Sequence, residues 1–138
     1  MAKTGHQIEG DVFRLLKASP LCAMISGKVY RQGTRPRDSK KEDAVVIFTG
    51  GLTEQIQSGV VTINIYVPDK TPNKNGVYLE DGARAEVLET AAQAWVESLA
   101  SHPYYDFSLQ KTIYTDDEPE IHQHFIVIKL KFNNSQNL

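Results

Sequence analysis

Cysteine is nearly absent from this sequence, because Cys22 is the only one among 138 residues. A disulfide framework inside the chain and a zinc site built from several cysteines are both excluded, and a reducing interior is the expected environment. No run of about 18 apolar residues occurs, so no membrane-spanning helix is expected. The first residues lack the apolar stretch of a secretory signal peptide, so none is expected.

An excess of either charge is also missing. Lysine plus arginine total 15 and aspartate plus glutamate total 17, which leaves a formal net charge of −2. Proteins that coat nucleic acids need a strong positive excess, and membrane surfaces attract clusters of basic residues, so we expect no direct contact with either. Hydrophobic residues make up 41% of the chain, which is too many for a disordered protein and enough for one core.

Two segments carry the periodicity of amphipathic helices. Residues 8–18 place one apolar stripe on a helix, formed by Ile8, Val12, Leu15 and Leu16. Residues 80–101 place a second stripe, formed by Leu88, Ala91, Ala92, Trp95 and Leu99. Each helix is expected to end before a proline, because the residue preceding a proline avoids the helical conformation.

Five segments are predicted as β-strands, at residues 28–31, 44–49, 57–67, 109–114 and 121–132. The clearest signal is the strict alternation in 57–67, where Val61, Ile63, Ile65 and Val67 share one face. This strand is expected to pair with the preceding one as a hairpin across 50–57. The acidic segment 115–120 is expected to form a turn before the last strand.

The predicted elements indicate an α+β fold of one domain over residues 1–138, with a core at about 8–132 and flexible ends at 1–7 and 133–138. Consecutive strands with short turns pair antiparallel, and helices bury their apolar stripe against a sheet. The expected architecture is a two-layer sandwich. It has a mainly antiparallel, four- to five-stranded sheet, with two helices packed on one face.

No group of residues has the pattern of a catalytic or cofactor site. His122 and His124 are two residues apart and are expected on one strand face, where two imidazoles are suited to ligate a metal in an enzyme. A zinc site normally needs three or four converging ligands, and the sequence offers no others at a suitable spacing. We therefore predict no catalytic residues, no cofactor and no metal site, while a metal-dependent enzyme stays open as an alternative.

The order of elements over residues 8–132 resembles a known family. The resemblance rests on Val12-Phe13-Arg14-Leu15-Leu16 in the first helix, on Ile25-Ser26-Gly27-Lys28-Val29-Tyr30, on Arg35-Pro36-Arg37, and on a strand that ends in an apolar-Tyr-Val-Pro-Asp stretch. The helix with Trp95 and the closing pair of strands follow in the same order. In this layout the chain is similar to the tail terminator proteins of tailed bacteriophages and prophages, also called tail completion or head–tail joining proteins.

This resemblance implies a structural protein without enzyme activity or cofactor. Such a protein forms a ring, commonly a hexamer, that sits on the end of the tail tube and stops its polymerisation. The implied partners are further copies of the chain, the tail tube and head–tail connector proteins. The implied location is the virion or the host cytoplasm, and the gene can belong to a prophage.

A ring of this kind needs two different surfaces on each subunit that fit each other. The basic and the acidic segments of the sequence are the candidates to meet across subunits, on charge alone. The candidate contact residues are Arg31, Arg35, Arg37, Lys40 and Lys41 on the basic side and Asp116, Asp117 and Glu118 on the acidic side.

A small intracellular ligand-binding or regulatory α+β domain is the alternative function. Its ligand is expected between the sheet and the helices. A hydrophobic pocket lined by Trp95 and Tyr66 would distinguish this alternative from a structural subunit.

Overall fold

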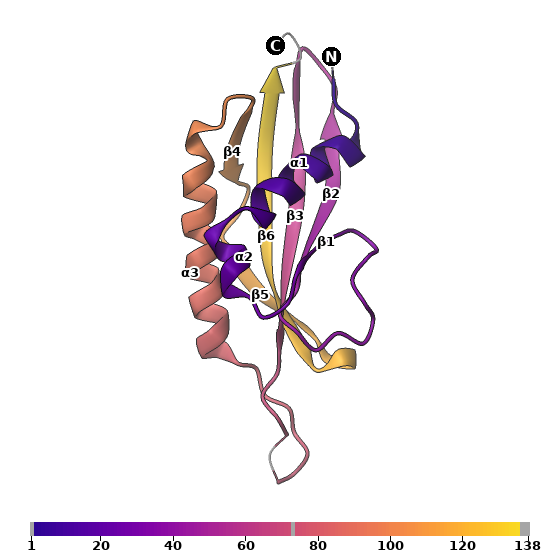
Figure 1. Ribbon diagram of the computed structural model, residues 1–138, viewed down its shortest axis with the longest axis vertical. Coiled ribbons are helices and arrows are strands. Elements are labelled where there is room, and N and C mark those ends of the chain that lie inside the picture. The colour runs from indigo at the N-terminus through magenta and orange to yellow at the C-terminus, as the bar shows by residue number, and fades with distance from the viewer. Residues whose placement is uncertain (1, 73, 136–138) are drawn as a thin grey trace.

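The computed structural model describes residues 2–72 and 74–135 of the chain. Within these residues a mixed, open sheet of six strands packs against three helices, so the predicted α+β class is confirmed (Figure 1). The helices are α1 (Gly5–Lys17), α2 (Pro20–Met24) and α3 (Gly82–Ser98). The strands are β1 (Val29–Arg31), β2 (Ala44–Leu52), β3 (Ile56–Pro68), β4 (Tyr105–Leu109), β5 (Tyr114–Glu118) and β6 (Gln123–Ser135).

The sheet has the strand order β1-β2-β3-β6-β4, and β5 also pairs with β6. All neighbours are antiparallel except β1 and β2, which are parallel. The long connection 32–43 explains this exception, because two parallel strands need a connection that brings the chain back to the end of the sheet at which the first strand began. The prediction of four or five strands and two helices is therefore too low on both counts.

The predicted strand 109–114 is wrong. The strand β4 ends at Leu109 and β5 begins at Tyr114, so most of the predicted segment connects two shorter strands. The length of β6 explains the split. Its upper half pairs with β4 and its lower half pairs with β5, so the two short strands lie end to end along one edge of β6.

The core lies between the helices and one face of the sheet. Figure 1 shows α1 crossing in front of the central strands and α3 running along the side of the sheet. The buried apolar side chains of α1 are on the predicted stripe, at Ile8, Val12 and Leu16. They belong to one apolar cluster with the inward residues of β3 and β6, at Val61, Ile63, Ile65, Ile126, Ile128, Leu130 and Phe132.

Regular secondary structure begins earlier in the chain and ends later than predicted. The helix α1 begins at Gly5 because Thr4 and Gln7 form a capping box, in which each side chain accepts a hydrogen bond from the backbone N–H of the other residue. At the other end, residues 133–135 continue β6 and pair with residues 56–58 of β3. Residues 5–7 and 133–135 are thus parts of regular elements, and residues 136–138 lie outside the described residues.

The face of the sheet opposite the helices carries aromatic side chains. The register places Tyr30, Val45, Asn64, Val127 and Tyr114 in one row across five strands. In the next row the rings of Tyr66 and Phe125 are 5.5 Å apart. The connection 32–43 folds onto this part of the sheet, and it contains four of the eight residues predicted to contact other subunits.

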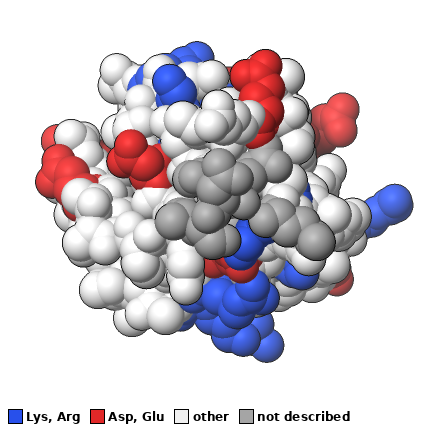
Figure 2. All heavy atoms as spheres, turned by 90° about the horizontal axis from the view of Figure 1, so that it is seen from above, with Lys and Arg blue, Asp and Glu red and all other residues white. Residues whose placement is uncertain are grey.

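A long loop, residues 69–81, connects β3 to α3 and extends from the lower end of the molecule (Figure 1). Its base is closed by a bridge between Lys70 and Leu79. At the opposite end, where both termini lie, Lys and Arg gather in one patch on the helix side of the molecule (Figure 2).

Candidate functional site

Arg35, one of the predicted contact residues, points back onto the sheet. Its Nε donates to Asp43 Oδ2 at 2.9 Å and its Nη2 donates to Gln123 Oε1 at 2.9 Å. The guanidinium carbon lies 4.0 Å from the centre of the Tyr66 ring. Only 11% of the Arg35 side chain is exposed, so this residue holds the 32–43 connection in place rather than facing a neighbour.

Asp43, the carboxylate that Arg35 binds, is buried, with only 1% of its side chain exposed. Its Oδ1 accepts from the backbone N–H of Lys28, and its Oδ2 accepts from Arg35 and from the hydroxyl of Ser39. Burial opposes ionisation, but the hydrogen bonds from Ser39, Lys28 and Arg35 prevail and hold the pKa of Asp43 below its usual value. The carboxylate therefore stays charged at neutral pH and keeps both ends of the connection together.

The other basic candidates divide into two groups. Arg31 is half-buried and pairs with Glu9, while its Nη2 donates to the backbone oxygen of His6 on α1. Arg37, Lys40 and Lys41 are exposed and belong to the connection that follows β1 at one edge of the sheet. These three side chains are the ones free to meet a partner.

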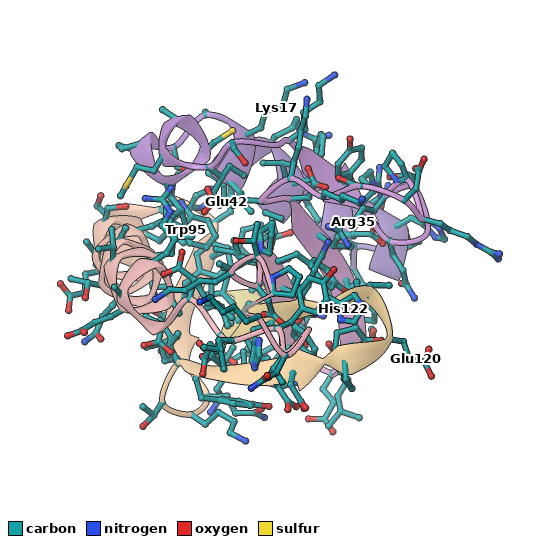
Figure 3. All side chains as sticks on the ribbon, turned by 90° about the horizontal axis from the view of Figure 1, so that it is seen from below. Lys17, Arg35, Glu42, Trp95, Glu120 and His122 are labelled. Atoms are coloured by element: carbon teal, nitrogen blue, oxygen red, sulfur yellow. The ribbon has the colours of Figure 1, made fainter. Side chains whose placement is uncertain are left out.

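The acidic candidates lie in a strand and not in the predicted turn. Asp116, Asp117 and Glu118 belong to β5, which pairs with the lower half of β6. The turn consists of Pro119–Ile121, and Glu120 at its tip points outward at the rim of the molecule (Figure 3). The sequence signal was misleading because three successive acids are unusual in a strand, whereas an edge strand tolerates exposed charges.

Asp116 and Asp117 are exposed, whereas Glu118 is half-buried near Tyr66. Burial raises the pKa of Tyr66, and the negative charge of Glu118 raises it further while Arg35 lowers it. Arg35 and Glu118 thus act on the same ring within one subunit. The structure brings together one member of each candidate set here. The exposed acidic candidates lie in β5, and the connection that carries the exposed basic candidates reaches the start of the neighbouring β6, where Gln123 donates to the backbone oxygen of Ser39.

A cavity of about 490 Å³ lies beside the 32–43 connection. Its lining includes Ser26, Tyr30, Pro36, Lys40 and Lys41. Sequence analysis did not identify this cavity, nor the roles of Asp43, Tyr66 and Gln123 in closing the connection over the sheet. No local pattern marks these three residues, because Asp43 and Gln123 are 80 positions apart in the chain and meet only in the folded sheet.

The two histidines do not share a strand face as predicted. His122 precedes β6 and has a left-handed backbone, with φ of 55°, so its ring turns away and stacks on Tyr78 at 3.8 Å. His124 lies in β6, and its Nδ1 is 2.6 Å from Oδ1 of Asp69. Together they attach the 69–81 loop to the β5–β6 connection. Among the described residues no group of three or more His, Cys, Asp or Glu side chains is arranged to hold a metal ion.

Trp95 and Tyr66 lie on opposite sides of the sheet. Trp95 is buried in the core between α3 and the strands, with 4% of its surface exposed, and Figure 3 shows it on the helix side. Tyr66 lies under Arg35 on the other face. The hydrophobic pocket expected between these two residues is therefore not formed.

The chain matches no protein-family model, and no curated protein matches it either. In residues 2–72 and 74–135, no helix is long and apolar enough to cross a membrane.

Proposed function

We propose that the protein is a ring-forming structural subunit of the bacteriophage or prophage tail-terminator or tail-completion type. It assembles at the end of a tail tube, most simply as a hexamer, and its partners are the tube and head–tail connector proteins. Its role is mechanical, so it needs no catalytic residues and no cofactor. The virion or the host cytoplasm is its place of action.

The observation that carries this proposal is that exposed side chains of opposite charge lie on two separate segments of the chain. Arg37, Lys40 and Lys41 belong to the connection that follows β1, and Asp116 and Asp117 belong to β5 at one edge of the sheet. A closed ring uses two different surfaces of each subunit, one fitting the other. Complementary charges on two such surfaces favour the correct register between neighbours.

The edges themselves support the same arrangement. The strand β1 pairs only with Ala44–Val46, so the remaining part of β2 continues beyond it. On the other side, β4 and β5 share the edge of β6. We propose that the fold is a two-layer sandwich in which the helices cover one face of the sheet. This arrangement leaves both edges of the sheet for neighbouring subunits.

A charge swap tests this assembly. Arg37→Glu with Lys40→Glu should reduce the ring fraction in native mass spectrometry, and Asp116→Lys with Asp117→Lys should do the same. Combining all four changes should restore assembly, because each altered surface again meets the opposite charge. The control is Lys17→Glu on α1, which changes charge without touching either edge. Rings that persist in both reversed variants would rule out this interface.

A small ligand-binding domain is the second candidate. The cavity of about 490 Å³ beside the 32–43 connection favours it, because ligand pockets commonly have volumes of this order. This alternative predicts a monomer whose thermal unfolding is shifted by one class of small molecule. A screen by thermal unfolding, repeated with Tyr30→Ala, separates it from a structural subunit.

A further inference from the structure

Two arginine side chains meet over Gly10, a buried glycine in the middle of α1. A Cβ atom at position 10 would lie 3.3 Å from Nη1 of Arg14 and also 3.3 Å from Nη1 of Arg31. The two nitrogens are therefore at most twice that distance apart. Like charges come this close at a cost, so a geometry that holds them together needs an explanation.

Other nitrogens of the same side chains fix this geometry. Arg14 donates through Nη2 to Oδ1 of Asp11 at 2.7 Å. Arg31 donates through Nε to Oε1 of Glu9 at 3.3 Å and through Nη2 to the backbone oxygen of His6 at 2.6 Å. Among the described residues neither Nη1 has a hydrogen-bond partner, so both are directed at the space over Gly10 and remain able to donate.

This space is a cavity of about 440 Å³, which Lys3, His6 and Asp11 line together with the two arginines. The carboxylate of Asp11 does not compete for the free nitrogens. Its Oδ2 accepts from Lys3 Nζ at 2.5 Å and from the hydroxyl of Tyr105 at 2.6 Å, and its Oδ1 accepts from Arg14.

Lysine and arginine outnumber acids around the cavity, since Lys3, Arg14 and Arg31 face only Asp11 and the buried Glu9. A concave site with an excess of positive charge attracts an anion.

We propose that Arg14 and Arg31 form a binding site for a single phosphate-type oxyanion, with Lys3 as the third cation. Guanidinium N–H groups bind oxyanions through bonds of about 2.8 Å. One tetrahedral anion between the two Nη1 atoms accepts from both through different oxygens. The inference does not depend on the proposed ring.

Calorimetric titration with inorganic phosphate at low ionic strength tests the proposal. The wild-type protein should bind one phosphate per chain in a saturable manner. Arg14→Gln and Arg31→Gln should each weaken binding about tenfold, the effect of losing a hydrogen bond to a charged group. Lys74→Gln is the control, because it removes one positive charge from the exposed 69–81 loop at the lower end of the molecule, and it should bind like the wild type.

Gly10→Ala keeps the test decisive if an arginine variant unfolds. Alanine favours the helix relative to glycine, so the melting temperature should not fall. Its Cβ occupies part of the space beneath the two guanidinium groups and requires each of them to shift by a few tenths of an ångström, so binding should weaken. Wild-type affinity in Gly10→Ala would overturn the proposal, as would no saturable binding or equal losses in Lys74→Gln and Arg14→Gln. Displacement of phosphate by acetate at equal concentration would contradict the assignment to phosphate.

Discussion

The guanidinium group of Arg35 lies over the Tyr66 ring, 4.0 Å from its centre, on the face of the sheet opposite the helices. The same group binds Asp43 and Gln123, so one side chain joins a connection, β3 and the start of β6. A basic residue that sequence analysis assigned to subunit contacts thus has an intramolecular role. Charge changes meant to test assembly therefore belong at Arg37, Lys40 and Lys41.

Arg35→Ala should lower the free energy of unfolding by about 3 kcal/mol, because it leaves the buried carboxylate of Asp43 without its cation. Urea denaturation followed by circular dichroism measures the change. Arg37→Ala is the control two residues away, where the exposed side chain should contribute less than about 0.5 kcal/mol. Equal effects of the two substitutions would show that Arg35 does not anchor the connection.

Arg84 attaches α3 to the start of β2 and should not be replaceable by lysine. Its Nε and Nη2 donate to the two carboxylate oxygens of Glu42 at 2.7 and 2.9 Å, and Nη2 also donates to the backbone oxygen of Met24. Arg84→Lys removes this two-point contact and should cost about 1 kcal/mol in unfolding free energy. Arg37→Lys makes the same chemical change at an exposed position and should leave the free energy of unfolding unaltered.

The protein should lose stability in acid. Hydrogen bonds from Arg84 hold the pKa of Glu42 below its ordinary value of 4.5, and that of Asp43 is also held below its ordinary 3.8. The unfolded chain therefore binds more protons than the folded one as the pH falls below about 5. The stabilisation is complete above this pH and decreases as the pH falls through the folded pKa values.

Urea denaturation at a series of pH values between 7 and 3 measures this dependence. Asp43→Asn should start from a lower stability and show a shallower slope, since one of the responsible carboxyls is gone. If the free energy of unfolding of the wild type stays constant down to pH 3, the pKa values of Glu42 and Asp43 are not lowered in the folded protein.

Gly59 in β3 should not tolerate a side chain. A Cβ there would overlap the backbone oxygen of Gly50 and lie 2.8 Å from the Phe132 ring, next to the irregular register between Phe48 and Gly50. Gly59→Ala should destabilise the protein by about 2 kcal/mol in thermal or urea unfolding. Gly50→Ala is the matched control in the paired strand, because its Cβ would meet no atom within 4 Å. A similar loss in both variants would mean that overlap with Gly50 and Phe132 is not responsible.

The strongest periodic signals predicted the fold best. The alternation of apolar and polar residues predicted β3, and the apolar stripes predicted α1 and α3. Both patterns arise because an element that buries one face carries its apolar residues on that face. The parallel pairing of β1 and the division between β4 and β5 were missed. Both depend on which edge of the sheet the chain reaches after a long connection, and no local pattern encodes this.

The candidate site was less predictable than the fold. The charged residues could be identified from the sequence, but Arg35 could not be distinguished from Arg37 two positions later. Arg35 packs against Asp43 and Tyr66, whereas Arg37 is exposed. Sequence analysis also placed His122 and His124 on one face, although the left-handed backbone of His122 directs the two rings to different partners. In each case a contact from a distant part of the chain decides the outcome.

Native mass spectrometry of the wild-type protein over a range of concentrations and salt levels tests the proposed assembly most directly. We expect one closed species at a fixed multiple of the 15.5 kDa chain, most simply six. Its abundance should fall as salt screens the charged contact residues. A monomer at every concentration, both alone and with an isolated tail-tube subunit, would contradict the proposed assembly.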